Sequence, residues 1–236
     1  MLPRESATMQ QVKVLVADDS AFMRNALTNM LASDPEIRVI ATARDGVEAI
    51  EKTAACKPDI VTLDVEMPRM DGLEALRVIM DKHPVPVIMV SSLTTEGAKE
   101  TLQALELGAV DFLPKNLSDL SINIVKIKEI LIEKVKEIAR RGPVRRRPRE
   151  QAEHKAPVVM PVRTTGERRV GLVVVGSSTG GPRALQDFIP KLPKDFPAPI
   201  VIAQHMPPNF TGLFAERLNQ LSQIEVREAK EGDVLQ

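Results

Sequence analysis

Short β-branched runs alternate with longer segments of helical spacing from Val12 to about Ile138. Apolar residues in the longer segments recur every three or four positions, which is typical of helices with one buried face. Such alternation predicts parallel βαβ units, with helices on both faces of a sheet. The predicted strands are Val12 to Ala17, Ile37 to Thr42, Asp59 to Leu63, Val85 to Val90 and Asp111 to Leu113. The predicted helices are Phe22 to Leu31, Val47 to Ala55, Leu73 to Asp81, Glu96 to Leu107 and Ile122 to Ile138.

The region after the fifth helix has no apolar periodicity. A basic run from Arg140 to Arg149 is followed by a stretch with Pro and Thr residues that ends near Arg169. Like charges and prolines keep such a segment extended, which favours a flexible linker. The basic run could instead bind acidic partners or nucleic acid. Because no folded recognition motif accompanies it, the linker is the favoured interpretation.

A second α/β pattern starts at Val170. A strand at 170–175 leads into the turn Gly-Ser-Ser-Thr-Gly-Gly-Pro at 176–182, a helix follows at 183–189, and Pro199 to Gln204 forms another strand. The predicted fold class is therefore α/β: a five-stranded doubly wound parallel domain, a flexible linker, and the first part of a second parallel α/β domain. We place the receiver at residues 12–132 and the first part of the second domain at 170–236. Residues 133–169 hold the end of the last receiver helix and the basic flexible linker.

Composition narrows the classes of function. The 236 residues carry 32 basic and 32 acidic side chains and no Trp or Tyr, so we expect no nucleic-acid partner. A single cysteine, Cys56, excludes an internal disulfide framework, and the first residues lack the apolar core of a signal peptide. No run of about 18 apolar residues occurs, so we expect no membrane insertion and a cytoplasmic location.

Polar residues follow the strands of the first unit at one edge. Asp18 and Asp19 end the first strand, Asp64 follows the third, Ser91 follows the fourth and Lys115 follows the fifth. Ligands of doubly wound sheets bind at this carboxyl edge. Three clustered carboxylates repel one another unless a cation lies between them, and hard oxygen ligands suit Mg²⁺. A carboxylate held there can attack phosphorus, although each residue taken alone could simply cap a helix or lie at the surface.

Four segments of the first unit are VLVADDSAFMR, DIVTLDVEMPRMDGLEAL, VIMVSSLT and ALELGAVDFLPK. Together they resemble the receiver domain of bacterial response regulators. The resemblance implies that Asp64 accepts a phosphoryl group from a histidine kinase. It also implies that Asp18, Asp19, Asp64 and the backbone carbonyl of Glu66 hold Mg²⁺. The resemblance further implies a switch made of Ser91, Phe112 and Lys115. One departure is Asn116, because receivers usually have Pro directly after the lysine.

The turn at 176–182 offers more than a connection between a strand and a helix. Its glycines permit a sharp bend and close approach of a substrate, and Ser178 lies between them. Helix capping and a phosphate cradle are alternative roles. The turn lacks the Lys of a P-loop, the spacing of a dinucleotide fingerprint and the G-x-S-x-G nucleophile elbow. His205 ends the next strand, on the edge where Ser178 should lie, so it is a candidate general base.

Two segments of the second unit are VVVGSSTGGPRAL and IVIAQHMPPNFTGLFAERLN. They resemble the catalytic domain of the chemotaxis protein-glutamate methylesterases, and the receiver, linker and esterase order resembles that family's architecture. The resemblance implies a serine hydrolase without a cofactor, in which Ser178 is the nucleophile and His205 the base. Its substrates would be glutamate methyl esters and particular glutamines of methyl-accepting chemotaxis receptors.

The family's third catalytic residue is an aspartate in a Gly-Met-Gly-x-Asp-Gly type segment, which this sequence does not contain. Asp187, Asp195 and Asp233 lie in other contexts, so we assign none of them. We therefore expect a fragment that holds only the N-terminal part of the esterase domain. We also expect it to be inactive by itself, because loss of a triad aspartate costs about 10⁴ in turnover.

A phosphorylatable domain tethered to a hydrolase suggests control by occlusion. The unphosphorylated receiver would cover the Ser178 cleft, and phosphorylation at Asp64 would release it. The alternative is a non-catalytic response regulator whose second unit docks a partner when the receiver is phosphorylated. A transcription factor is less favoured, because no helix-turn-helix pattern follows the receiver.

Overall fold

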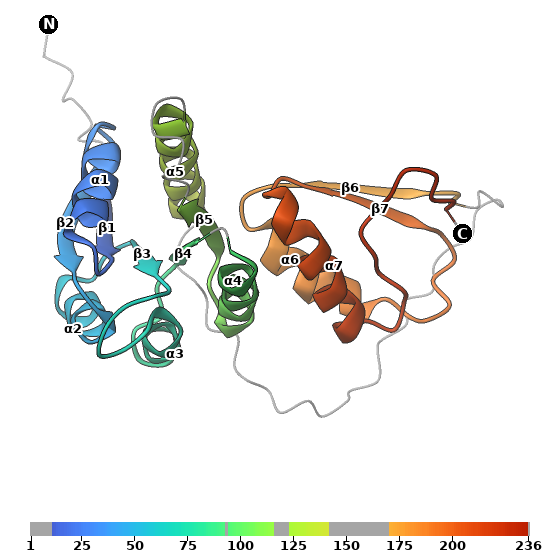
Figure 1. The fold of residues 1–236 in the computed structure, drawn as a ribbon, viewed down its shortest axis with the longest axis horizontal. Helices are drawn as coiled ribbons and strands as arrows, with labels where there is room; N and C mark the ends of the chain where they lie inside the picture. Colours follow the sequence, from blue (N-terminus) through green and yellow to red (C-terminus); the bar gives the residue numbers. More distant parts are fainter. Residues whose placement is uncertain (1–10, 93, 116–122, 142–169, 236) are drawn as a thin grey trace, which may run out of the picture.

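The computed structural model describes residues 11–92, 94–115, 123–141 and 170–235, which form two parallel sheets with their helices (Figure 1). Residues 142–169, most of the predicted linker, lie outside the described residues. No helix in the described ranges combines the length and apolar character that a membrane span requires.

The first unit is a five-stranded parallel sheet with the strand order β2-β1-β3-β4-β5. Helices α1 and α5 cover one face, and α2, α3 and α4 cover the other (Figure 1). This is the doubly wound α/β fold that the sequence predicts. Its strands are β1 (Val12–Ala17), β2 (Ile37–Ala43), β3 (Ile60–Asp64), β4 (Val87–Ser92) and β5 (Asp111–Lys115). Its helices are α1 (Ala21–Ala32), α2 (Gly46–Cys56), α3 (Gly72–Lys82), α4 (Thr95–Leu107) and α5 (Asn123–Arg140).

Side-chain caps fix where the helices of the first unit start. Ser20 and Asp45 each accept a backbone N–H at the N-termini of α1 and α2. Asp71 forms a reciprocal capping box with Glu74 at the start of α3. Each cap replaces a missing intrahelical hydrogen bond directly after a strand-end loop. The loops that carry the candidate site residues are therefore held on the helix side as well as on the strand side.

The second unit is a two-stranded parallel sheet of β6 (Val173–Ser177) and β7 (Ile200–Gln204). Between the strands lie α6 (Gly181–Phe188) and the 3₁₀ turn η1 (Ile189–Lys191), and α7 (Pro208–Leu221) follows β7. The strand pattern did not predict α7. Its buried Phe210, Phe214 and Leu218 recur every fourth residue, which is the signal that identifies it.

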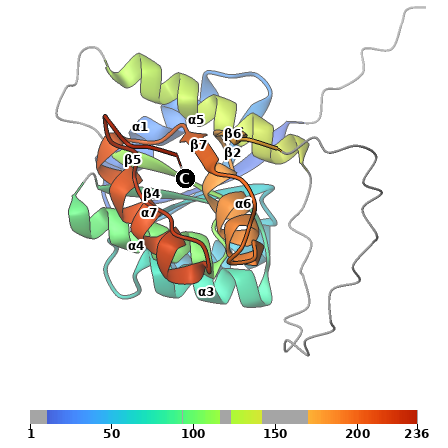
Figure 2. The same ribbon diagram turned by 90° about the vertical axis from the view of Figure 1, so that its right-hand side faces the viewer.

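Helices α6 and α7 lie between the β6–β7 sheet and the first unit, with α7 beside α4 (Figures 1 and 2). Leu185 of α6 and Phe210 of α7 belong to the same buried apolar cluster as Leu105 of α4 and Phe112 of β5. The two units therefore share a continuous core rather than a thin polar contact.

Polar contacts surround this apolar interface. The backbone N–H of Gly180 donates to Asp111 Oδ2 at 3.1 Å, and Arg183 Nη1 donates to the Gly108 carbonyl at 2.8 Å. Arg217 of α7 forms an ion pair with Glu106 of α4. The same surface of the first unit thus contacts both α7 and the turn that carries Ser178.

Candidate functional sites

The carboxyl edge of the first sheet brings together an acidic cluster and one lysine. Oxygen atoms of Asp18, Asp19 and Asp64 lie within 4.8 Å of one another. Lys115 Nζ lies 2.6 Å from Asp64 Oδ2 and 2.9 Å from Asp18 Oδ2. Asp18 and Asp64 are buried, whereas Asp19 is exposed. The strand order accounts for this convergence, because β1 lies next to β3 and Lys115 ends β5.

The electrostatics of this cluster favour a proton or a cation beside Asp64. Burial raises the pKa of the Asp64 carboxyl to about 6, although the hydrogen bond and charge of Lys115 act in the opposite direction. The charge of Asp18 adds to the rise. Burial alone would lower the pKa of Lys115, but its hydrogen bond and ion pair with Asp64, followed by those with Asp18, raise it above its ordinary value.

The donor set fits a small hard cation. Three carboxylates supply oxygen ligands, and Asp19 faces solvent, so bound water can complete the coordination of Mg²⁺. Glu66 lies two residues after Asp64, and its backbone N–H donates to Asp64 Oδ1 at 3.4 Å. These residues, with the Glu66 carbonyl, are the ones expected to hold the ion.

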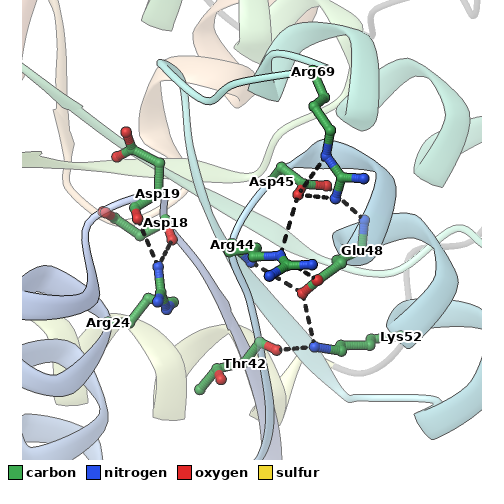
Figure 3. Close-up of polar contacts among 9 residues, drawn as sticks. All are labelled: Asp18, Asp19, Arg24, Thr42, Arg44, Asp45, Glu48, Lys52 and Arg69. Carbon is green, nitrogen blue, oxygen red and sulfur yellow. Dashed lines mark hydrogen bonds and ion pairs between the residues drawn. The ribbon is translucent and has the colours of Figure 1, made fainter.

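Two arginines hold the loops of this site through hydrogen bonds (Figure 3). Arg24 Nη1 donates to the carbonyl oxygens of both Asp18 and Asp19, each at 2.7 Å. Arg69 Nε donates to Asp45 Oδ2 at 3.0 Å, and a second guanidinium nitrogen contacts the same oxygen. Because Asp45 caps α2, Arg69 ties the loop after β3 to the loop after β2. The sequence reasoning overlooked both arginines.

The three expected switch residues occupy different surroundings. Ser91 is buried, and its hydroxyl is hydrogen-bonded to Thr101 of α4 at 2.7 Å. Lys115 forms ion pairs with the carboxylates of Asp18 and Asp64. Phe112 points toward the second unit, where its ring stacks on Phe210. The aromatic residue is therefore in contact with the second unit.

The second candidate site joins the turn after β6 to the end of β7. Ser178 Oγ lies 3.3 Å from Nδ1 of His205, and both residues are exposed. Gly180 has φ +69°, a left-handed conformation that glycine adopts without strain, and this turns the chain into α6. Ser177 pairs with Gln204 in the parallel ladder, so the two catalytic candidates follow adjacent strands at the same level.

Two further groups meet at this turn. Gln204 donates from Nε2 to the Ser178 carbonyl at 3.0 Å, and Asp111 of the first unit accepts from Gly180. The sequence reasoning missed both residues. Among the described residues, no Asp or Glu side chain forms a hydrogen bond or ion pair with His205.

The fold of the first unit and its acidic cluster define a class of protein, the response regulators with a receiver domain, and the second unit matches a methylesterase family. The profile of the "Response regulator receiver domain" family matches residues 14–124, and that of "CheB methylesterase" matches residues 173–236. The crystal structure of the response regulator domain of Thermotoga maritima CheB is similar to this chain, with a TM-score of 0.51 and 46% identity. That match covers 56% of this chain and 98% of the other.

Relatives over nearly the whole chain specify the family. The protein-glutamate methylesterase/protein-glutamine glutaminase of Pyrococcus horikoshii is 53% identical, in a match that covers 96% of this chain and 61% of the relative. The protein-glutamate methylesterase/protein-glutamine glutaminase 2 of Pseudomonas savastanoi is 45% identical, with 95% and 69% covered. The chain belongs to the protein-glutamate methylesterase/protein-glutamine glutaminase family. It spans about three fifths of the length of its Pyrococcus relatives.

Proposed function

We propose that the protein is the phosphorylation-regulated esterase of a chemotaxis system. In this proposal a receiver domain (12–132) and a linker region (133–169) precede the N-terminal part of a methylesterase domain (170–236). Its substrates are glutamate methyl esters and particular glutamines of cytoplasmic parts of chemoreceptors. The observation that carries the esterase assignment is the 3.3 Å approach of Ser178 Oγ to the His205 ring.

The proposed reaction proceeds through an acyl-enzyme. His205 takes the proton from Ser178 as Oγ bonds to the ester carbonyl carbon. The carbon–methoxide bond then breaks, and the leaving oxygen takes that proton and departs as methanol. Water, deprotonated by His205, attacks the acyl carbon, and Ser178 regains its proton as the glutamate is released. With a glutamine substrate, ammonia leaves in place of methanol. This chemistry requires no cofactor.

The proposed regulatory step is phosphoryl transfer to Asp64. One Asp64 oxygen bonds to phosphorus as the bond to the kinase histidine breaks. A Mg²⁺ ion at the cluster supplies charge neutralisation when it is bound. Lys115, 2.6 Å from Asp64, is placed to stabilise the phosphoryl oxygens, and Arg24 keeps the backbone of Asp18 and Asp19 in position.

We propose that the receiver restricts access to the esterase site in its unphosphorylated form. The contacts of Phe112 with Phe210 and of Asp111 with Gly180 place the receiver beside the serine turn. Because Ser178 itself is exposed, the block acts on a bulky receptor and leaves the hydroxyl open to a small ester. Phosphorylation favours a state in which this contact is weaker.

Two substitutions test the proposal in a protein that carries the complete catalytic domain. Ser178→Ala should reduce methanol release from methylated receptor by at least about 10³-fold, because the acyl-enzyme cannot form. Ser222→Ala, at the end of α7, is the matched control and should retain activity. Normal hydrolysis by Ser178→Ala would reject Ser178 as the nucleophile, whereas receptor binding without hydrolysis by the parent would favour the alternative of a docking protein. Asp64→Asn should abolish stimulation by a phosphodonor, and persistent stimulation would reject the regulatory assignment.

A further inference from the structure

We propose that Gln204 is a positioning residue that sets the relative placement of Ser178 and His205. This inference rests on the proposed esterase function. Gln204 is the last residue of β7 and is half-buried between the serine turn and His205. Its amide is neutral and is neither a nucleophile nor a base, so it does not take part in the chemistry directly. Its amide, however, contacts the backbones of both catalytic candidates.

The amide nitrogen uses both of its hydrogens on these backbones. Nε2 donates to the Ser178 carbonyl at 3.0 Å and to the His205 carbonyl at 3.1 Å. A primary amide has two N–H donors, and both point to these two residues. A single planar group therefore joins the residue that attacks to the residue that takes its proton.

The orientation of the amide is also fixed. Ser177 Oγ donates to Oε1 of Gln204 at 2.6 Å. A flipped amide would direct Oε1 at two carbonyl oxygens and lose both donors, so this hydrogen bond and the two from Nε2 specify the same orientation. Ser177 thus holds the amide in the orientation that joins Ser178 to His205.

The amide packs closely against the backbone of Gly181. A Cβ at Gly181 would lie only 2.1 Å from Gln204 Oε1 and 2.8 Å from Ser177 Cβ, so only glycine admits the amide there. The Gly181 N–H donates to the Ser178 carbonyl at 2.9 Å, and the His205 N–H donates to the Ser177 carbonyl at 2.9 Å. Both backbone polar groups of His205 are therefore bonded to the serine turn or to Gln204.

In this proposal the arrangement sets the distance between Ser178 Oγ and the His205 ring, on which proton transfer depends. Misplacement of reacting groups by about 1 Å can cost on the order of 10²-fold in rate. Loss of the amide donors removes the bridge between the Ser178 and His205 carbonyls, and the backbone bond from His205 to Ser177 then holds the two segments less tightly. The binding of substrate should change little. The expected signature is a fall in kcat with little change in KM.

The test compares Gln204→Glu and Gln204→Met in a protein with the complete catalytic domain. Neither side chain can donate to the two carbonyls at neutral pH, and Met carries no charge, so a shared defect is due to the lost donors. We expect kcat on methylated receptor to fall by roughly 10²-fold with KM within about threefold. Ser177→Ala should cost only a few-fold, because both Nε2 donors remain. Gln220→Glu, exposed on α7, is the matched charge control and should have normal kinetics.

A kcat within about threefold of the parent in both Gln204 variants would overturn the inference. Hydrogen exchange in the 236-residue chain gives a second readout that does not require hydrolysis. Gln204→Met should speed exchange of the His205 amide several-fold and leave β1 to β5 unchanged, and equal exchange would also overturn the inference. If Ser178→Ala retained full activity, the proposed mechanism through Ser178 would fail, whatever the Gln204 variants show.

Discussion

The ring of Phe112 stacks on the ring of Phe210, with centroids 4.9 Å apart and planes 11° from parallel. Phe112 belongs to β5 of the first unit and Phe210 to α7 of the second unit, and both are buried. The residue that the receiver resemblance implies as a switch is thus part of the inter-domain contact itself. A change in the position of Phe112 would therefore be transmitted to α7 by direct packing.

Phe112→Ala should raise the activity of the unphosphorylated enzyme toward receptor. Loss of a stacked aromatic pair removes about 1 kcal/mol beyond the lost burial. One to two kcal/mol shifts a two-state ratio by roughly 5 to 30-fold. We expect basal methanol release to rise several-fold and the further gain from a phosphodonor to shrink. The comparison is with Phe188→Ala, which removes an exposed ring of α6. Unchanged basal activity in Phe112→Ala would contradict the proposed role of the contact.

The effect of phosphorylation on the rate of hydrolysis should depend on the size of the substrate. Ser178 and His205 are exposed although the receiver is docked, since the receiver contacts the neighbouring Gly180 and Thr179. A small aryl ester should be hydrolysed at nearly the same rate before and after phosphodonor is added. Hydrolysis of methylated receptor should increase in the same samples. Equal stimulation of both substrates would indicate that phosphorylation acts on the catalytic groups and not on access.

Asp64→Asn should stabilise the receiver at neutral pH in the absence of metal. Burial raises the Asp64 pKa from 3.8 to about 6, so the folded state binds this proton more tightly than the unfolded state does. Stability contributed by the protonated carboxyl is therefore lost as pH rises from about 4 to 6. The shift corresponds to at most about 3 kcal/mol.

Urea unfolding in EDTA measures this effect. At pH 7.5 the free energy of unfolding of Asp64→Asn should exceed that of the parent by about 1–3 kcal/mol, and the difference should nearly vanish at pH 4. Added Mg²⁺ should stabilise the parent and not the variant. A less stable variant at pH 7.5 in EDTA would contradict the argument.

Arg69→Ala should weaken Mg²⁺ binding without removing a ligand. Arg69 holds Asp45, and the link fixes the loop that carries Glu66. The Asp45 carboxyl is buried, and although burial alone would raise its pKa, the hydrogen bond from Arg69 contributes to a net lowering. We expect the Mg²⁺ dissociation constant, measured by NMR titration, to rise several-fold. Arg44→Ala is the matched control, because Arg44 is 68% exposed and pairs mainly with Glu48. An equal effect of both substitutions would show that the Arg69 link has no special role.

The sequence was sufficient for the elements of the first unit because its strands are short, largely apolar runs separated by segments of helical spacing. The five strands and five helices predicted there are all present, and β1 has the predicted bounds. β4 starts at Val87 and not at the predicted Val85, since Pro86 has no N–H to donate to a ladder. The convergence of Asp18, Asp64 and Lys115 followed from strand ends alone.

The sequence alone did not identify side chains whose contacts are with residues far away along the chain. Gln204 is next to His205 in sequence, but its side chain also bonds to Ser177 and Ser178 in a turn one βαβ unit away. Asp111 meets Gly180 only because two units dock, and Arg69 meets Asp45 only because two loops are adjacent. The periodicity of apolar and polar residues along the chain does not indicate such pairs. Their roles depend on tertiary geometry, which spacing does not encode.

The hydrogen bond from Gly180 to Asp111 limits how freely the two domains can be recombined. Asp111 precedes Phe112, so two consecutive residues of β5 meet the serine turn and α7 respectively. If the proposed function is correct, a receiver from another response regulator that lacked this Asp-Phe pair would still accept phosphate but would not control the hydrolase. Chimeric enzymes would need the β5 dipeptide and the facing side of α4 to be transplanted together.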